Sequence, residues 1–205
     1  TGTCKTTFCM LLAAEAVSEN KRVLYLDTEF NLPEFSIPKE KAPFFELRHI
    51  MDFNSLSSWV RNVVQGSKKY DLIIIDSITA PVESRMSELR LDEKGKAFQE
   101  MYALMFKLKS YAITRGAVVV VVNQISYDLS SGQKGLDGVR PFGGKSKHMS
   151  KEIWFSQLEV ATQDVTKAKF VVWRSRRFGR GTPICSVTVS GSDKVKVGVT
   201  WHVKV

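Results

Sequence analysis

The sequence has little of what marks secreted, metal-binding or membrane-spanning proteins. It contains only three cysteines and three histidines among 205 residues, and none of them shows the spacing of a metal site. An odd number of cysteines fits a reducing cytoplasm better than a disulfide framework. No stretch approaches the roughly 18 uninterrupted apolar residues of a membrane span, and no secretory signal is evident. We therefore expect a cytoplasmic protein that is not associated with membranes.

The composition is that of an ordinary globular protein, with 43% hydrophobic and 25% charged residues and no low-complexity tract. Because neither an internal repeat nor a domain boundary is visible, residues 1–205 are expected to form a single domain. The net charge of +9 is compatible with binding to nucleic acid, with acidic partners or simply with solubility. The basic residues gather in the C-terminal half, from Lys145 to Lys151 and from Lys167 to Arg180.

Short apolar runs alternate with longer amphipathic segments. Three β-branched runs are continuously apolar, as expected of strands that helices bury on both faces: Val23–Leu26, Leu72–Ile75 and Val118–Val122. Three segments carry apolar residues at helical spacing: Thr6–Asn20, Ser55–Gly66 (opened by Asn54 or Ser55) and Glu93–Arg115. This alternation predicts an α/β fold with a mainly parallel central sheet flanked by helices.

After Val122 the pattern changes. Residues 126–150 are rich in glycine and polar residues, which predicts a long mobile loop of the kind that usually carries function or is disordered. Three further segments look like strands joined by turns: Trp154–Val160, Lys169–Arg174 and Cys185–Ser190. We expect these strands to be antiparallel and to be added at the C-terminal edge of the parallel sheet.

The N-terminus has the form of the second half of a Walker A loop, whose full pattern is G-x-x-x-x-G-K-[ST]. Lys5 and Thr6 form the Lys-Thr pair and lead directly into the first helix. In such a loop, backbone N–H groups and the helix N-terminus hold phosphates, the lysine reaches the β- and γ-oxygens, and the hydroxyl is a ligand of Mg²⁺. Cys4 stands where the final glycine belongs, so we expect reduced nucleotide affinity or turnover.

This first motif is incomplete as it stands. The chain opens inside the loop and without an initiator methionine, so we expect the natural sequence to continue upstream. On its own, the fragment has an alternative interpretation as a threonine-rich helix start.

The second motif, Tyr70–Ser77, has the form of a Walker B strand, in which buried apolar residues lead to Asp76. Open α/β sheets bind ligands at the carboxyl ends of their strands, so Asp76 is placed to hold the coordination shell of Mg²⁺.

A third motif, Leu24–Glu29, is a strand that ends in Asp-Thr-Glu, and Asn123-Gln124 follows the next apolar run. In this order the motifs resemble the RecA/RadA recombinase family over nearly the whole chain. They are most like those of the smaller archaeal RadA paralogues, the RadB- and RadC-like proteins. The resemblance implies a RecA-like P-loop NTPase core that uses ATP and Mg²⁺.

The resemblance also implies roles for individual residues. Glu29 is expected to be the general base that polarises the attacking water. Gln124 is expected to sense the γ-phosphate and to couple the nucleotide state to the following loop. Lys5 completes the expected catalytic set, and Thr6 and Asp76 are the expected Mg²⁺ ligands. The expected nucleotide-binding residues are Gly2, Thr3, Cys4, Lys5, Thr6, Thr7 and Asp76.

Two segments, Arg85–Lys96 and Tyr127–Phe142, occupy the positions of the family's DNA-binding loops. Phosphate contacts are expected from five basic residues: Arg85, Arg90, Lys134, Arg140 and Lys145. For any one of them, the alternative is a solvated surface charge. The basic run Lys169–Arg180 has three interpretations, namely a DNA-facing patch, an arginine finger that reaches a neighbouring subunit, or a plain basic turn.

The short chain and Cys4 argue against a full strand-exchange recombinase. They favour a paralogue that assists or regulates homologous recombination and DNA repair. We expect a DNA-dependent ATPase with slow hydrolysis, whose partners are single- or double-stranded DNA and a RadA-type recombinase, with homo-oligomers also compatible. One alternative is a non-catalytic accessory module that binds DNA or a recombinase and has a degenerate nucleotide site. Another is a KaiC-like ATPase without a DNA role.

Overall fold

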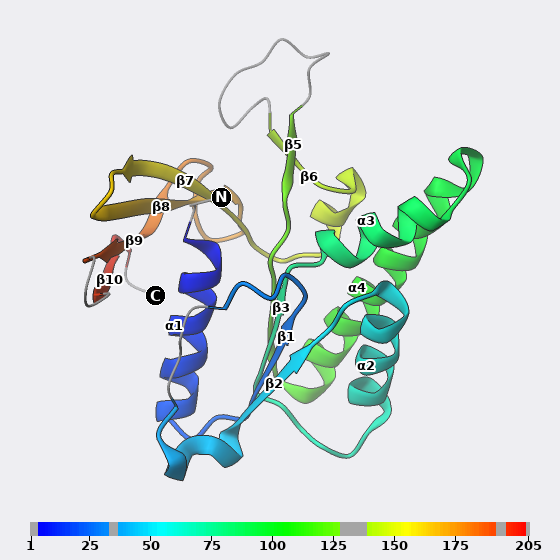
Figure 1. The fold of residues 1–205 in the computed structure, drawn as a ribbon, viewed down its shortest axis with the longest axis horizontal. Coiled ribbons are helices and arrows are strands. Elements are labelled where there is room, and N and C mark those ends of the chain that lie inside the picture. The colour runs from blue at the N-terminus through cyan, green and yellow to red at the C-terminus, as the bar shows by residue number, and fades with distance from the viewer. Residues whose placement is uncertain (1–3, 33–36, 128–138, 192–195, 204–205) are drawn as a thin grey trace.

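A parallel sheet lies at the centre of the molecule (Figure 1). The computed structural model describes residues 4–32, 37–127, 139–191 and 196–203. The four strands of this sheet have the order β2-β1-β3-β4 and all run parallel. Their bounds are Val23–Asp27 for β1, Phe45–His49 for β2, Leu72–Asp76 for β3 and Val118–Val121 for β4.

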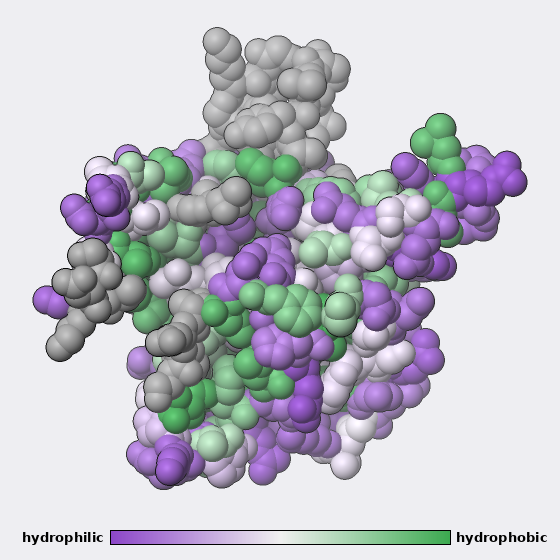
Figure 2. Space-filling view, in the orientation of Figure 1, coloured by the Kyte–Doolittle hydropathy of each residue, from purple (hydrophilic) through white to green (hydrophobic). Residues whose placement is uncertain are grey.

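Helices cover both faces of the parallel sheet, as Figure 1 shows. The α-helices are α1 (Lys5–Ser18), α2 (Phe53–Gln65), α3 (Thr79–Glu88) and α4 (Lys94–Arg115), and the 3₁₀ helices are η1 (Lys39–Phe44), η2 (Leu91–Glu93) and η4 (Gly144–His148). Successive strand residues point to opposite faces. Tyr25 and Ile74 therefore pack with α1, whereas Leu24 and Ile73 pack with α2 and α4. Figure 2 shows hydrophilic side chains over much of the α2–α4 side of the molecule.

The antiparallel strands form a second sheet. Its order is β10-β9-β8-β7, with β7 at Ile153–Ala161, β8 at Val165–Arg174, β9 at Pro183–Ser190 and β10 at Lys196–Trp201. This sheet packs against α1 through Phe8, whose ring lies 4.6 Å from that of Phe170. The predicted α/β class, with helices flanking a parallel sheet and antiparallel strands after it, is confirmed. The antiparallel strands were expected at the edge of the parallel sheet. They instead form a separate sheet that packs against α1.

Two local predictions are corrected by the structure. The side chain of Asp52 caps α2 by accepting a hydrogen bond from the Ser55 backbone N–H at 2.9 Å, so the helix opens earlier than Asn54 or Ser55. The region 126–150, predicted as one long loop, contains secondary structure. A short antiparallel pair, β5 (Ile125–Tyr127) with β6 (Val139–Pro141), is followed by η4. Residues 128–138 lie outside the described part of the chain.

The outer edge of β4 borders an apolar groove of about 610 Å³. The other walls of the groove come from α1, α4 and the first residues of β7, so it lies between the two sheets. Val118 at this edge is 60% exposed. None of the described helices combines the length and the hydropathy needed to cross a membrane.

Candidate functional site

The N-terminus of α1 carries the Lys5-Thr6 pair. The helix begins at Lys5, directly after Cys4, which has a left-handed backbone with φ of 52° and ψ of 21°. Such a conformation favours glycine, which has no Cβ to crowd the backbone. The local geometry thus matches that of a loop that ends in glycine, although the residue present is cysteine. Gly2 and Thr3 of the predicted nucleotide loop lie outside the described residues.

Asp76 ends β3 on the face of the sheet that α1 covers. Its side chain is only 3% exposed, and its Oδ2 accepts a hydrogen bond from the Tyr25 hydroxyl at 2.8 Å. The Thr6 side chain, at the start of α1, lies near this carboxylate and favours its charged form. Burial raises the pKa of Asp76, the Tyr25 hydrogen bond and the Thr6 side chain oppose that rise, and the nearby charges of Glu29 and Asp27 add to it. A cation placed here would favour the charged form of Asp76.

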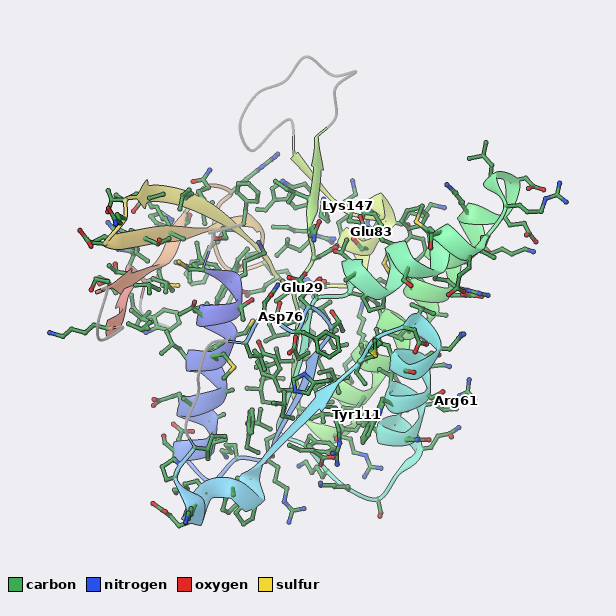
Figure 3. The ribbon with its side chains drawn as sticks, in the orientation of Figure 1. Glu29, Arg61, Asp76, Glu83, Tyr111 and Lys147 are labelled. Atoms are coloured by element: carbon green, nitrogen blue, oxygen red, sulfur yellow. The ribbon has the colours of Figure 1, made fainter. Side chains whose placement is uncertain are left out.

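Glu29 lies two residues beyond the end of β1, and Figure 3 shows it beside Asp76 at the same end of the sheet. Its Oε1 accepts a hydrogen bond from the Ser77 hydroxyl at 2.6 Å. Its backbone N–H donates to Oδ1 of Asp27 at 3.1 Å. The side chain of Glu29 is partly exposed. One hydrogen bond therefore holds the carboxylate of Glu29 and another holds its backbone, while the side chain stays partly accessible to solvent.

The Thr28–Ser77 contact joins β1 and β3 beyond their last paired residues. The Thr28 hydroxyl donates to the Ser77 carbonyl at 2.6 Å and accepts from the Ser77 N–H at 2.8 Å. Both residues are buried, and the Asp76–Ser77 peptide bond is cis. This pairing fixes Glu29, which follows β1, and Asp76, which ends β3, relative to one another.

The side chains at this end of the sheet have the chemistry of a nucleotide–Mg²⁺ site. Mg²⁺ takes oxygen ligands, and it is usually held by one or two carboxylates together with waters and substrate phosphates. The Thr6 hydroxyl and the Asp76 carboxylate supply such oxygens and lie near one another. Lys5 provides a positive charge at the same helix terminus, where the backbone N–H groups of the first turn favour the binding of an anion. The residues present therefore fit Mg²⁺ and the phosphates of a nucleotide.

Gln124 follows β4 and links it to the region after β6. Its backbone N–H donates to the Thr79 hydroxyl at 2.9 Å, and its carbonyl accepts from the Phe142 N–H at 2.9 Å. The neighbouring Asn123 accepts from Thr79 and donates to the Phe142 carbonyl. The side chain of Gln124 is exposed. A shift at the end of β4 would thus be passed through the backbone to Phe142.

Gly143 ends this link with a left-handed backbone, at φ of 67°. A Cβ at this position would lie 2.5 Å from Cε of Met101 and 3.1 Å from the Phe98 ring. The left-handed conformation therefore favours glycine here, and a Cβ would also force the end of the Met101 side chain to shift. Gly143, which directly follows the predicted second DNA-binding loop Tyr127–Phe142, is therefore explained by its local backbone conformation.

Arg85, the first of the predicted DNA-binding residues, is engaged within the protein. Its guanidinium lies 3.0 Å from the Glu88 carboxylate and 3.3 Å from that of Glu100. These contacts link α3 to α4 and leave the side chain 27% exposed. A DNA phosphate at this position would have to compete with two carboxylates.

Two of the other basic residues predicted to bind DNA are exposed to solvent. Arg90 is 84% exposed and lies 3.5 Å from Asp92. Lys145 is exposed on η4. Arg140 belongs to β6, but its side chain lies outside the description, and Lys134 lies outside the described residues altogether. Arg90 and Lys145 are therefore the described candidates that face solvent.

Arginines of the basic run Lys169–Arg180 are engaged by other residues of the protein. Three arginines make contacts there: Arg174 with the Lys147 carbonyl at 2.5 Å, Arg177 with Glu152 at 3.1 Å and Arg180 with the Trp173 ring at 5.3 Å. Contacts of this kind favour the interpretation as a structured basic turn.

Comparison with known proteins identifies the family. No protein-family model matches the chain. Its sequence is 30% identical over 197 residues to the DNA repair and recombination protein RadB of Methanococcoides burtonii, covering 92% of this chain and 82% of that protein. It is also 30% identical over 163 residues to RadB of Archaeoglobus fulgidus, covering 74% of this chain and 68% of the relative. RadB of Thermoplasma volcanium is 28% identical over 205 residues. The chain belongs to the RadB family.

Membership of the RadB family confirms the resemblance to the RecA/RadA recombinases that the sequence motifs indicated. The parallel sheet with flanking helices agrees with a RecA-like core. Thr6, Glu29 and Asp76 lie near one another at one end of that sheet, although they are far apart in this RadB-family sequence. Lys5 is the first residue of α1, directly before Thr6. Their individual roles remain predictions from the resemblance.

Several polar residues of the site in this RadB-family chain were not found from the sequence. They are Tyr25, Thr28, Ser77, Thr79 and His49. His49, which the sequence gave no partner, lies with Nδ1 3.1 Å from Oδ2 of Asp27 and stacks on the Phe30 ring. These residues carry no spacing signal, because each contact joins strands that are far apart in the chain. Tyr25, Thr28 and Ser77 lie within the motif segments Leu24–Glu29 and Tyr70–Ser77, whereas no motif includes His49.

Proposed function

We propose that this RadB-family protein binds ATP with Mg²⁺, hydrolyses it slowly, binds DNA, and assists or regulates a recombinase. The observation that carries the proposal is that Thr6, at the start of α1, Asp76, at the end of β3, and the carboxylate of Glu29 lie near one another. A phosphate-binding helix terminus, a carboxylate for the metal and a candidate general base therefore share one end of the sheet.

Each side chain has a distinct task in the proposed reaction. Lys5 and the α1 N–H groups bind and orient the phosphates. Mg²⁺, when bound by Thr6 and Asp76, neutralises charge on the phosphate oxygens. Glu29 orients a water molecule and accepts its proton, and the hydrogen bond from Ser77 fixes the direction of the Glu29 carboxylate. Gln124 relates the state of the site to the segment that ends at Phe142.

DNA binding is supported by the charge of the protein and, separately, by its membership of the RadB family. The net charge of +9, with its basic residues in the C-terminal half, favours a polyanion as partner. Relatives that carry the name DNA repair and recombination protein RadB cover most of the chain. Membership of the RadB family supports a RadA-type recombinase as the protein partner.

The experiment that tests the proposal is ATP hydrolysis by the full-length protein, with and without single-stranded DNA. Lys5→Ala and Glu29→Gln are measured alongside the wild type. We expect turnover that rises with DNA and disappears in both variants. No turnover in the wild type, with DNA binding intact, would contradict hydrolysis. That result would support an accessory module whose nucleotide site Cys4 impairs, and loss of DNA binding at low salt would instead favour a KaiC-like ATPase.

A further inference from the structure

Tyr25 is the buried residue that stands out beside the proposed metal site. Its side chain is fully buried, yet it carries a hydroxyl, and the described partner of that hydroxyl is the Asp76 carboxylate at 2.8 Å. Phenylalanine would fill the same space on the α1 face with the same apolar surface. A buried hydroxyl is unfavourable unless it makes a hydrogen bond, so the hydroxyl needs an explanation beyond packing.

The sheet register explains how the two residues meet. Tyr25 pairs with Ile74, and Asp27 pairs with Asp76, in the parallel ladder between β1 and β3. Tyr25, Ile74 and Asp76 therefore point to the same face of the sheet, towards α1. The tyrosine is long enough to reach along this face, past Ile74, to the carboxylate at the end of the next strand.

We infer that Tyr25 is a positioning residue for the metal site: its hydroxyl holds Oδ2 of Asp76, so that the carboxylate keeps one orientation towards Thr6 and Mg²⁺. This inference rests on the proposed function. A ligating carboxylate that is itself hydrogen-bonded has a fixed orientation, and loss of such a supporting contact typically lowers metal affinity by about 10- to 100-fold. Tyr25 touches neither the nucleotide nor the metal and acts through Asp76.

The structure provides a matched control for this inference. Tyr111 is also buried, and its hydroxyl accepts a hydrogen bond from the Tyr70 N–H at 2.9 Å. Figure 3 shows Tyr111 at the opposite end of the sheet from Asp76. Tyr25→Phe and Tyr111→Phe each remove one buried phenol hydroxyl, but only the first lies at the proposed site.

The test is a Mg²⁺ titration of the binding of a fluorescent ATP analogue to the full-length protein. The same affinity is also measured in EDTA, and thermal unfolding is followed without ligand. For Tyr25→Phe we expect the half-saturating Mg²⁺ concentration to rise about tenfold, while the affinity in EDTA changes less than about twofold. For Tyr111→Phe we expect a loss of thermal stability with the Mg²⁺ dependence of the wild type.

The outcomes separate the inference from the proposed function. If the wild type binds the analogue in a Mg²⁺-dependent manner and Tyr25→Phe does so at the same Mg²⁺ concentration, the role of Tyr25 is wrong and the proposed function stands. An equal shift in Tyr111→Phe would also overturn the role, because the effect would then come from stability alone. If the wild type binds no nucleotide, or binds it without any effect of Mg²⁺, the proposed site itself is wrong and the role of Tyr25 falls with it.

Discussion

Two residues with left-handed backbones flank the candidate site. Cys4 precedes α1 with φ of 52°, and Phe30 follows Glu29 with φ of 56°. Residues other than glycine adopt this conformation at a free-energy cost of roughly 1–2 kcal/mol. Such positions persist where the surrounding structure holds them, and they cluster at functional sites. The side chains at both positions also pack, Cys4 against the cluster around Phe8 and Phe30 against His49.

Replacement of Cys4 by glycine is predicted to tighten nucleotide binding. Cys4→Gly removes the Cβ from a left-handed position next to Lys5, so the loop reaches its binding conformation with less strain. We expect the affinity for a fluorescent ATP analogue to rise several-fold, which corresponds to about 1 kcal/mol. The matched control is Asn20→Gly, which relieves a φ of 60° near the far end of α1. A gain of affinity in the control, or none in Cys4→Gly, would contradict the prediction.

A second prediction at this scale concerns Glu29. Glu29→Gln keeps the shape of the side chain and removes its capacity to accept a proton, so kcat is expected to fall by about 10²- to 10⁴-fold. Nucleotide affinity should stay close to that of the wild type, because the charge of Glu29 is not needed to hold phosphates. The control is Glu83→Gln, an exposed carboxylate on α3. Steady-state hydrolysis and equilibrium binding measure the two effects separately.

At the scale of elements, the start of α2 depends on one side chain. Asp52 accepts hydrogen bonds from both the N–H and the hydroxyl of Ser55, at 2.9 and 2.6 Å. The hydrogen bonds from the Ser55 side chain and backbone lower the pKa of Asp52. Because the folded state favours the charged form, this contribution to stability is complete above the pKa of the unfolded chain, about 3.9. It is lost as the pH falls through the lower pKa of the folded state.

Removal of this cap is predicted to destabilise the protein in a pH-dependent manner. Asp52→Ala should lower the free energy of unfolding by about 1 kcal/mol at neutral pH. The difference from the wild type should shrink as the pH falls below about 4. Asp52→Asn serves as the control, because asparagine caps helices without a titrating group. Urea unfolding at several pH values measures these differences, and a pH-independent loss in Asp52→Ala would count against the role of the charge.

At the scale of the whole molecule, the basic charge has a measurable consequence. Binding of DNA through phosphate contacts releases counterions, so the logarithm of the affinity should fall linearly with the logarithm of the salt concentration. Lys145→Glu should weaken binding about equally for different DNA sequences and reduce the slope by about one unit. Lys39→Glu, an exposed change on η1 outside the basic C-terminal half, serves as the control. Fluorescence anisotropy at several salt concentrations provides the test. Equal effects of the two variants on DNA affinity would show that binding depends only on net charge, and would contradict a specific role of Lys145.

The sequence by itself determined the elements whose signal is local. β1, β3 and β4 are continuous apolar runs, and α4 carries an apolar stripe and ends before Gly116, which has φ of 64°. The order of the motifs also predicted that Lys5, Thr6, Glu29 and Asp76 belong to one site, because parallel strands present their carboxyl ends at one edge. Each of these inferences needs only the local pattern of residues or the order of the motifs along the sequence.

Tertiary structure decided what depends on pairing between distant segments. β2 has the mixed sequence Phe-Glu-Leu-Arg-His, which becomes a strand through its pairing with β1. Tyr25 and Asp76 are 51 positions apart, and Ser77 and Glu29 are 48 apart. Whether such side chains meet depends on the register and face of two strands, and a slip of one residue would turn them to opposite faces. Packing of the sheet against α1 fixes that register, so the contacts that position the site follow from the fold as a whole.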